Sequence, residues 1–136
     1  MKKQLCSLLT ALALAVGLLP SAARAAENAP SFADVPAAAW YADVVQYVYE
    51  NGLMTGVSES EFAPDGTATR GQIVTILWRL AGSPVVNYAL DFEDVAEGQW
   101  YTEAVRWAAS EGIVTGTGKG FSPDAALTRE SLAAIL

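Results

Sequence analysis

Residues 32–41 read FADVPAAAWY, and residues 92–101 read FEDVAEGQWY. The likeness continues beyond these stretches at a shift of sixty residues and, after a deletion of one residue, resumes through the rest of the chain. The further matches pair Val45, Gly52, Thr55, Gly56, Phe62, Pro64, Asp65, Thr69 and Arg70 with Val105, Gly112, Thr115, Gly116, Phe121, Pro123, Asp124, Thr128 and Arg129. Self-similarity at a fixed period indicates one structural unit that occurs twice. We call residues 31–82 the first copy and residues 91–136 the second copy, which is incomplete.

Each copy is predicted to fold as a helix, a long loop and a second helix, so the fold class is all-α. In the first helix Trp40, Tyr41, Val44, Val45 and Val48 recur at a spacing of three and four residues, which is typical of one apolar face. Gly52 supplies a left-handed stop after this helix, and Gly112 supplies the same stop in the second copy. We expect helices near residues 40–50, 69–81, 100–110 and 128–136 and no extended sheet.

The second helix of each copy begins at a threonine. Thr69 followed by Gln72 forms a capping box, in which each side chain bonds the backbone of the other residue. Thr128 can still cap its helix, but the residue that matches Gln72 in the second copy is Ser131, so the reciprocal bond is not expected there. In the helix that begins at Thr69, the apolar stripe predicted to be buried consists of Ile73, Ile76, Leu77 and Leu80.

The loop of residues 51–68 is longer than most connections between helices, and loops of this length are usually functional or disordered. We expect an ordered loop, folded back by Phe62 and Pro64. The corresponding loop carries Phe121 and Pro123. The core is predicted to contain Phe32, Phe62, Phe92 and Phe121, while Asp34 and Asp94 are predicted to cap local turns.

The amino terminus has the order of a cleavable signal peptide: two lysines, an apolar run over residues 8–19 and the small residues of Ala23-Arg24-Ala25. Residues 1–25 are therefore predicted to be removed on export, and the apolar run is shorter than the ~20 residues of a membrane span. The sole cysteine, Cys6, leaves with this segment. Without cysteine or histidine, the mature chain is expected to hold no thiolate metal site and no cofactor.

Export changes the charge balance further toward the acidic side. The whole chain has a net charge of -7, and loss of Lys2, Lys3 and Arg24 leaves five basic residues against fifteen acidic ones. Nucleic acids and anionic membrane surfaces are bound through basic patches. We therefore expect neither as a partner, and no membrane insertion after cleavage.

The combined motif, F-x-D-V, W-Y, G-[LI]-x-T-G, F-x-P-D and T-R at the head of a helix, resembles the S-layer homology domain over residues 31–136. The resemblance implies mostly helical repeats, three of which usually assemble into a pseudo-threefold module. It also implies a cell-wall location and binding to secondary cell-wall polysaccharide, often with pyruvate ketals, or to a peptidoglycan-linked glycan. Further repeats, in the same chain or in an oligomer, are implied as partners.

The family's T-R-A-E motif falls on Thr69-Arg70-Gly71-Gln72 and on Thr128-Arg129-Glu130-Ser131, and only its first two residues occur in both copies. The resemblance thus implies that Thr69, Arg70, Thr128 and Arg129 bind ligand. A guanidinium can grip a carboxylate with two parallel bonds, and the start of a helix adds unpaired amides. The alternative is that each arginine pairs with a surface acid such as Asp65 or Asp124.

Two tryptophans, Trp40 and Trp100, are candidates for stacking on sugar rings, although both could instead pack at the helix starts. Arg79 and Arg106 have no basic counterpart in the other copy. Their replacement is therefore an internal control for the replacement of Arg70 and Arg129.

No catalytic site is predicted. Asp91, Glu93 and Asp94 are close in sequence, but glycoside hydrolysis needs two carboxylates facing each other across the substrate. We predict a non-catalytic anchoring module of an exported protein. The alternatives are a self-assembly module that binds no glycan and an anchoring fragment of a larger wall-attached enzyme.

Overall fold

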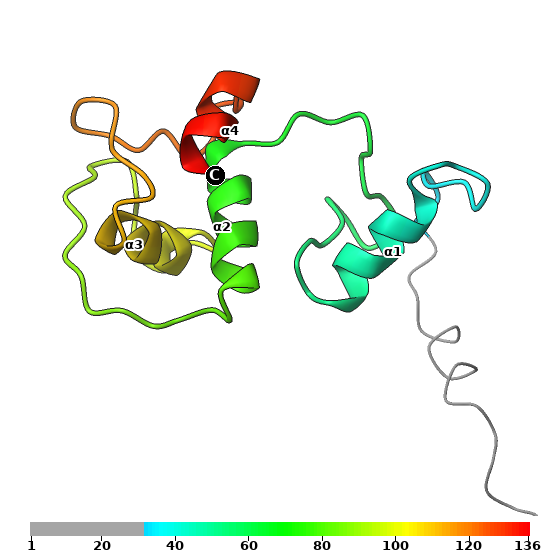
Figure 1. The fold of residues 1–136 in the computed structure, drawn as a ribbon, viewed down its shortest axis with the longest axis horizontal. Coiled ribbons are helices and arrows are strands. Elements are labelled where there is room, and N and C mark those ends of the chain that lie inside the picture. The colour runs from blue at the N-terminus through cyan, green and yellow to red at the C-terminus, as the bar shows by residue number, and fades with distance from the viewer. Residues whose placement is uncertain (1–31) are drawn as a thin grey trace, which may run out of the picture. The chain divides into compact units, whose positions relative to one another are not determined.

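A computed structural model describes residues 32–136 and contains four helices in this range: α1 (Ala42–Glu50), α2 (Arg70–Leu80), α3 (Thr102–Ser110) and α4 (Arg129–Ile135) (Figure 1). Within these residues strand pairing is limited to two isolated bridges, Thr69 with Ala126 and Thr117 with Gly120. The four predicted helices and the absence of an extended sheet are confirmed for this range. None of these four helices is long and apolar enough to cross a bilayer. The predicted signal peptide lies outside the described residues.

The helix ends follow the predicted capping chemistry. The Thr69 hydroxyl accepts from the Gln72 N–H at 3.3 Å, and the Gln72 amide oxygen accepts from the Thr69 N–H at 2.9 Å, which completes the capping box. Thr128 caps α4 through the Ser131 N–H at 3.1 Å. Gly52 follows the end of α1 with a φ of 65°, a left-handed conformation that glycine adopts without steric cost.

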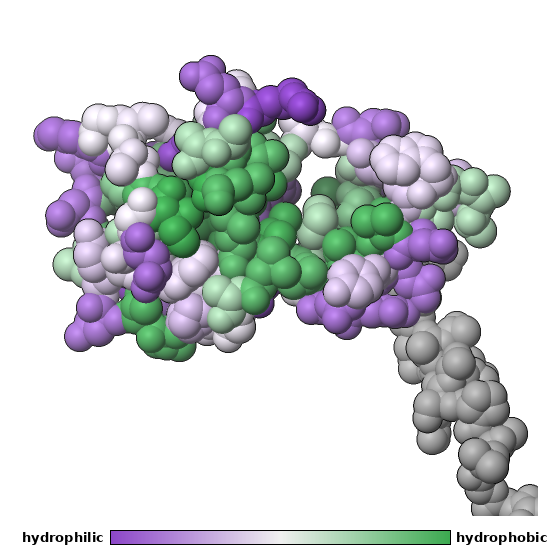
Figure 2. All heavy atoms as spheres, viewed as in Figure 1, coloured by the Kyte–Doolittle hydropathy of each residue, from purple (hydrophilic) through white to green (hydrophobic). Residues whose placement is uncertain are grey.

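The apolar face predicted for the first helix is only partly covered. Val45 is buried, with 6% of its surface exposed, whereas Val44 is 58% and Tyr47 is 60% exposed. Trp40, just before α1, is 89% exposed. Figure 2 shows hydrophobic residues at the surface over α1 and α2. Val44 and Tyr47 on α1, with Trp40 just before it, are therefore largely exposed to solvent.

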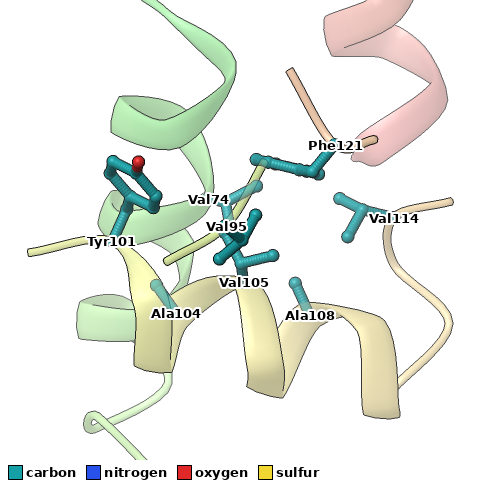
Figure 3. Close-up of a cluster of buried hydrophobic side chains, with 8 residues drawn as sticks. All are labelled: Val74, Val95, Tyr101, Ala104, Val105, Ala108, Val114 and Phe121. Atoms are coloured by element: carbon teal, nitrogen blue, oxygen red, sulfur yellow. The ribbon is translucent and has the colours of Figure 1, made fainter. Parts of the chain in front are cut away.

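The main core joins the two copies. Of the helices in residues 32–136, only α2 and α3 pack against each other, so the second helix of the first copy covers the first helix of the second copy. The hydrophobic cluster between these two helices also includes residues from the turn before α3 and from the loop after α3 (Figure 3). Its buried members are Val74, Val95, Tyr101, Ala104, Val105, Ala108, Val114 and Phe121.

The stripe predicted to be buried on α2 is only half-buried at Ile73, Ile76 and Leu77, and it is not the face that the core covers. Gly71, Val74 and Thr75 face the core, while Leu80 is 61% exposed. Counting apolar residues misses this face because Gly71 has no side chain and Thr75 is polar. The Thr75 hydroxyl is satisfied inside the helix, where it donates to the Gly71 carbonyl at 2.8 Å, so its burial costs little.

Of the four phenylalanines predicted in the core, Phe32 and Phe121 are buried. Phe62 and Phe92 are half-buried, and Phe92 packs against the main cluster. Phe32 belongs to a smaller apolar group, where its ring lies 5.5 Å from that of Phe62 and 5.6 Å from that of Tyr49.

Two aspartates hold the long loops in place, and they do so across the chain rather than in a local turn as predicted. The Asp34 carboxylate accepts from the N–H groups of Phe62 and Ala63, at 2.9 and 2.6 Å. Asp94 accepts from the N–H groups of Phe121 and Ser122, both at 2.7 Å. Each carboxylate therefore ties the start of its copy to the loop in front of the second helix, which explains why the loop is ordered.

These contacts lower the pKa of both carboxyls. For Asp34 the main cause is the bond from the Phe62 N–H, and a smaller desolvation effect opposes it. For Asp94 desolvation alone raises the pKa, but the N–H groups of Phe121 and Ser122, with a contribution from the charge of Arg70, lower it overall.

Because the folded state binds these protons more weakly than the unfolded chain does, their stabilising effect is full above pH ~4 and is lost as the pH falls below it. Urea unfolding monitored from pH ~6 to pH ~3 should show the midpoint falling at the acidic end. A variant with both Asp34→Asn and Asp94→Asn should be less stable at neutral pH and should lose less stability on acidification. An equal acid response in parent and variant would contradict this role.

Candidate functional site

The two copies meet where the start of α2 lies against the loop of the second copy. The N–H groups of Arg70 and Gly71 donate to the carbonyls of Ala125 and Pro123, both at 2.9 Å. In return, the Leu127 N–H donates to the Ala68 carbonyl at 3.0 Å. The first amides of a helix have no partner inside the helix, so this loop satisfies them and fixes the two copies together.

Arg70 adds its side chain to the same junction. Its Nε donates to the Phe121 carbonyl at 2.9 Å and its Nη2 to the Thr115 carbonyl at 3.3 Å. The guanidinium carbon also lies 4.8 Å from the centre of the Phe121 ring, within the range of a cation–π contact. Two of its three nitrogens are therefore engaged by the second copy.

Arg129, the matching residue, has a different environment. It is exposed at the start of α4, and its side chain makes no hydrogen bond or ion pair with the residues described. The pairing of Arg70 or Arg129 with Asp65 or Asp124, the alternative raised by the sequence, does not occur in this structure: the ion pairs formed within residues 32–136 involve Arg106 and Lys119.

A groove of about 190 Å³ lies beside this junction, between the loop of the first copy, α2 and Trp100 of the second copy. Its walls are largely apolar, and they include Leu53 and Phe62. Polar groups are supplied by Gln72 and by the threonines of the loop and α2. Small-molecule sites are commonly concave and mostly apolar, with a few polar groups that set orientation.

Arg79 is the one charged residue among those that line the groove. Its Nη1 donates to the Leu53 carbonyl at 3.0 Å, which holds the guanidinium against the wall. It is therefore not the neutral control that the overlay of the copies suggested. The overlay could not identify it, because the position matching Arg79 falls beyond Leu136. Arg106, bound to Glu97 at 2.8 Å and to Glu103 at 3.3 Å, does not line the groove.

Of the six candidates chosen from the sequence, Trp100 lines the groove. Its indole is 57% exposed and its edge lies close to Gly71, 3.6 Å from where a Cβ would be. Trp40 is exposed away from this groove, Thr69 and Thr128 serve as helix caps, and the two arginines lie at the helix starts. The six residues therefore do not form one cluster.

The groove combines an exposed aromatic face with one cation held in place. An indole can stack on the apolar face of a sugar ring, and a guanidinium can pair with a carboxylate. Among residues 32–136 no group of three or more His, Cys, Asp or Glu side chains is arranged to hold a metal ion. The arrangement is suited to binding a saccharide that carries an acidic group.

A family model for the S-layer homology domain matches residues 31–74 and again residues 91–133. The chain belongs to this family. The two matches lie within the copies of residues 31–82 and 91–136 and include the groove residues Phe62 and Trp100.

Individual relatives agree with the assignment. The chain is 33% identical over 135 residues to an S-layer protein of Bacillus thuringiensis subsp. finitimus and 31% identical over 135 residues to the S-layer protein sap of Bacillus anthracis. Each match covers 99% of this chain and 16% of the relative. It is also 31% identical over 96 residues to an amylopullulanase of Thermoanaerobacterium thermosulfurigenes, covering 71% of this chain and 5% of that enzyme.

S-layer homology domains thus occur in S-layer proteins and as small parts of larger enzymes. The chain spans about a sixth of the length of the S-layer relatives that it matches. Family membership and these relatives support a secreted location, at the cell surface or in the S-layer.

Proposed function

We propose that this S-layer homology chain is a non-catalytic module that anchors an exported protein to an acidic cell-wall polysaccharide. The observation that carries the proposal is the groove in which exposed Trp100 lies with Arg79, the one charged lining residue. The bound sugar would stack on the indole, and an acidic substituent such as a pyruvate ketal would pair with the guanidinium.

The arginines at the helix starts have different parts in this proposal. Arg129 is exposed and can offer its whole guanidinium to a carboxylate, as the family resemblance implies. Arg70 has only Nη1 without a hydrogen bond among the described residues, so we assign it chiefly to the junction between the copies. The acidic net charge of the chain does not oppose binding, because salt screens distant charges over about 8 Å.

Replacing Arg79 by alanine should weaken binding to purified cell-wall polysaccharide by about ten- to a hundredfold, because a charge-assisted interaction of about 1.5–3 kcal/mol is removed. Arg79→Lys should recover part of the loss, since a point charge cannot reproduce the fork of donors. Trp100→Ala should weaken binding by a similar factor through lost stacking. Isothermal titration calorimetry measures these changes.

Lys119→Ala is the matched control, because it removes one positive charge from an exposed residue paired with Glu93 outside the groove. The polysaccharide should also be tested after mild acid treatment, which hydrolyses ketals and should abolish the difference between Arg79 and its alanine variant. Thermal melting of each variant checks folding. If Arg79→Ala and Trp100→Ala melt and bind like the parent, the groove is not the glycan site.

The same titration bears on the two alternatives. A module that serves only in assembly would bind neither the native nor the treated polysaccharide. A fragment of a wall-attached enzyme would bind as proposed here, and the enzyme relative, of which the matched segment is a small part, supports that version of anchoring.

A further inference from the structure

The first helix of the first copy ends at the pair Asn51-Gly52, and both residues are exposed. An asparagine side-chain amide is thermolabile, because the backbone nitrogen of the next residue can attack it. Glycine in the next position favours the attack, since it has no side chain to hinder it and its backbone turns freely. At Gly52 the space is open: no atom lies within 4 Å of the place where a Cβ would be.

The reaction exchanges an amide for an acid without any redox change. The Gly52 nitrogen loses its proton to solvent and forms a bond to the Asn51 Cγ. The bond from Cγ to the side-chain nitrogen breaks, so ammonia leaves and a cyclic succinimide remains. Water then opens the ring at either carbonyl, which gives aspartate with a normal backbone or isoaspartate with the side-chain carbon inserted in the backbone. The net change converts an amide and water into a carboxylate and an ammonium ion.

The folded end of α1 holds the two reacting groups apart. The Asn51 Nδ2 donates to the Tyr47 carbonyl at 2.8 Å, and the Gly52 N–H donates to the Tyr49 carbonyl at 2.9 Å. Ring closure also requires the Gly52 nitrogen to eclipse the Asn51 Cβ about the Cα–C bond, whereas the ψ of 5° at Asn51 keeps these atoms apart. The reaction therefore has to start from a conformation in which the last turn of α1 is open.

The end of α1 can open without disturbing the main core. Within residues 32–136 this helix packs against no other helix, and Val44 and Tyr47 on it are largely exposed. Segments with few buried contacts open at the smallest free-energy cost in a folded protein. The open conformation is therefore expected to be populated while the rest of the chain stays folded.

Conversion would weaken the turn that follows α1. A carboxylate only accepts hydrogen bonds, so the bond to the Tyr47 carbonyl would be lost, and a negative charge is unfavourable at the carboxyl end of a helix. Isoaspartate also lengthens the backbone just before Leu53 and Met54, whose N–H groups close the turn at 2.8 and 3.1 Å. The Leu53 carbonyl in turn accepts from Arg79 at 3.0 Å, so the effect reaches the wall of the groove.

The second copy contains the same turn without the reactive amide. Glu111 and Gly112 occupy the matching positions. The N–H groups of Ile113 and Val114 donate to the Ala108 carbonyl at 2.9 and 3.3 Å, as those of the matching residues do after α1. A glutamate has no side-chain amide to lose, so this turn is a control inside the same chain.

We propose that Asn51 is a site of spontaneous modification, where the first copy is converted to aspartate and isoaspartate when the end of α1 opens. The matching turn of the second copy stays unchanged. The reactants are this chain and water, so the site does not depend on the proposed anchoring function.

Incubation of the purified secreted chain in mildly alkaline buffer, followed by peptide mass spectrometry, tests the proposal. Peptides that contain residue 51 should gain the mass difference between an amide and an acid, and electron-transfer fragmentation should identify isoaspartate. Asn87 is the matched control, because it is also exposed but is followed by Tyr88, whose side chain hinders attack, and it should convert much more slowly. Asn51→Gln should prevent the conversion, since its ring would be larger.

Two further measurements test the part assigned to α1. In urea, which opens the helix, Asn51 should convert about ten- to a hundredfold faster than in the folded chain. In the converted chain, hydrogen exchange at the N–H groups of Leu53 and Met54 should be faster than in the fresh chain, while Ile113 and Val114 should exchange as before.

The proposal is overturned if residue 51 keeps its amide in the folded chain, or if Asn51 and Asn87 convert at the same rate. Equal rates in urea and in buffer would contradict the protection by α1, and unchanged exchange at Leu53 would contradict the weakened turn. No polysaccharide is present in these experiments, so their outcome is separate from that of the binding titrations.

Discussion

Phe121→Ala is expected to lower the free energy of unfolding by about 3–5 kcal/mol, the usual effect of removing a fully buried aromatic side chain. Phe121 has no exposed surface and lies in the cluster shared by α2 and α3, where its ring is tilted against that of Phe92 at 5.8 Å between ring centres. Its ring is also the face against which the Arg70 guanidinium rests. The substitution therefore leaves a cavity in the core and weakens the junction between the copies.

The matched control is Phe62→Ala at the corresponding position of the first copy. Phe62 is only half-buried, so we expect a loss of about 1–2 kcal/mol. Chemical denaturation with both circular dichroism and tryptophan fluorescence measures the two values. Equal losses would show that the cluster shared by α2 and α3 contributes no more to stability than the smaller apolar group that contains Phe62.

Arg70→Ala is expected to lower the free energy of unfolding by about 2–4 kcal/mol, from two hydrogen bonds of a charged donor and one cation–π contact. The bonds reach the Phe121 and Thr115 carbonyls, which would be left without these donors. Because both acceptors belong to the second copy, the loss falls on the junction itself. The same denaturation experiment measures it.

Arg129→Ala is the natural comparison, since the two arginines match in the overlay but only Arg70 is engaged. In the single chain Arg129→Ala should change stability by less than about 0.5 kcal/mol, as is usual for an exposed residue. If both variants are destabilised equally, or neither is, the contacts of Arg70 do not hold the copies together.

The difference between these arginines shows where overlaying the copies stops being informative. The overlay treats matched residues as equivalent, yet Arg70 faces a neighbouring loop while Arg129 faces solvent. Which surface of one copy contacts the other copy depends on how the whole chain folds. The overlay could not identify Arg79 either, because its matching position falls beyond Leu136, whereas the structure places Arg79 in the groove through α2 and the Leu53 carbonyl.

The sequence by itself determined the helices, their caps and the family, because these depend on residues close together in the chain. Thr69 with Gln72 and Gly52 after α1 are local signals, and the repeated motif lies within each copy. Only the tertiary structure decided which face of α2 is buried, what Asp34 and Asp94 hold, and that Trp100 and Arg79 share a groove. These features join residues about 20 to 50 positions apart, and periodicity along one helix contains no information about which distant segment covers it.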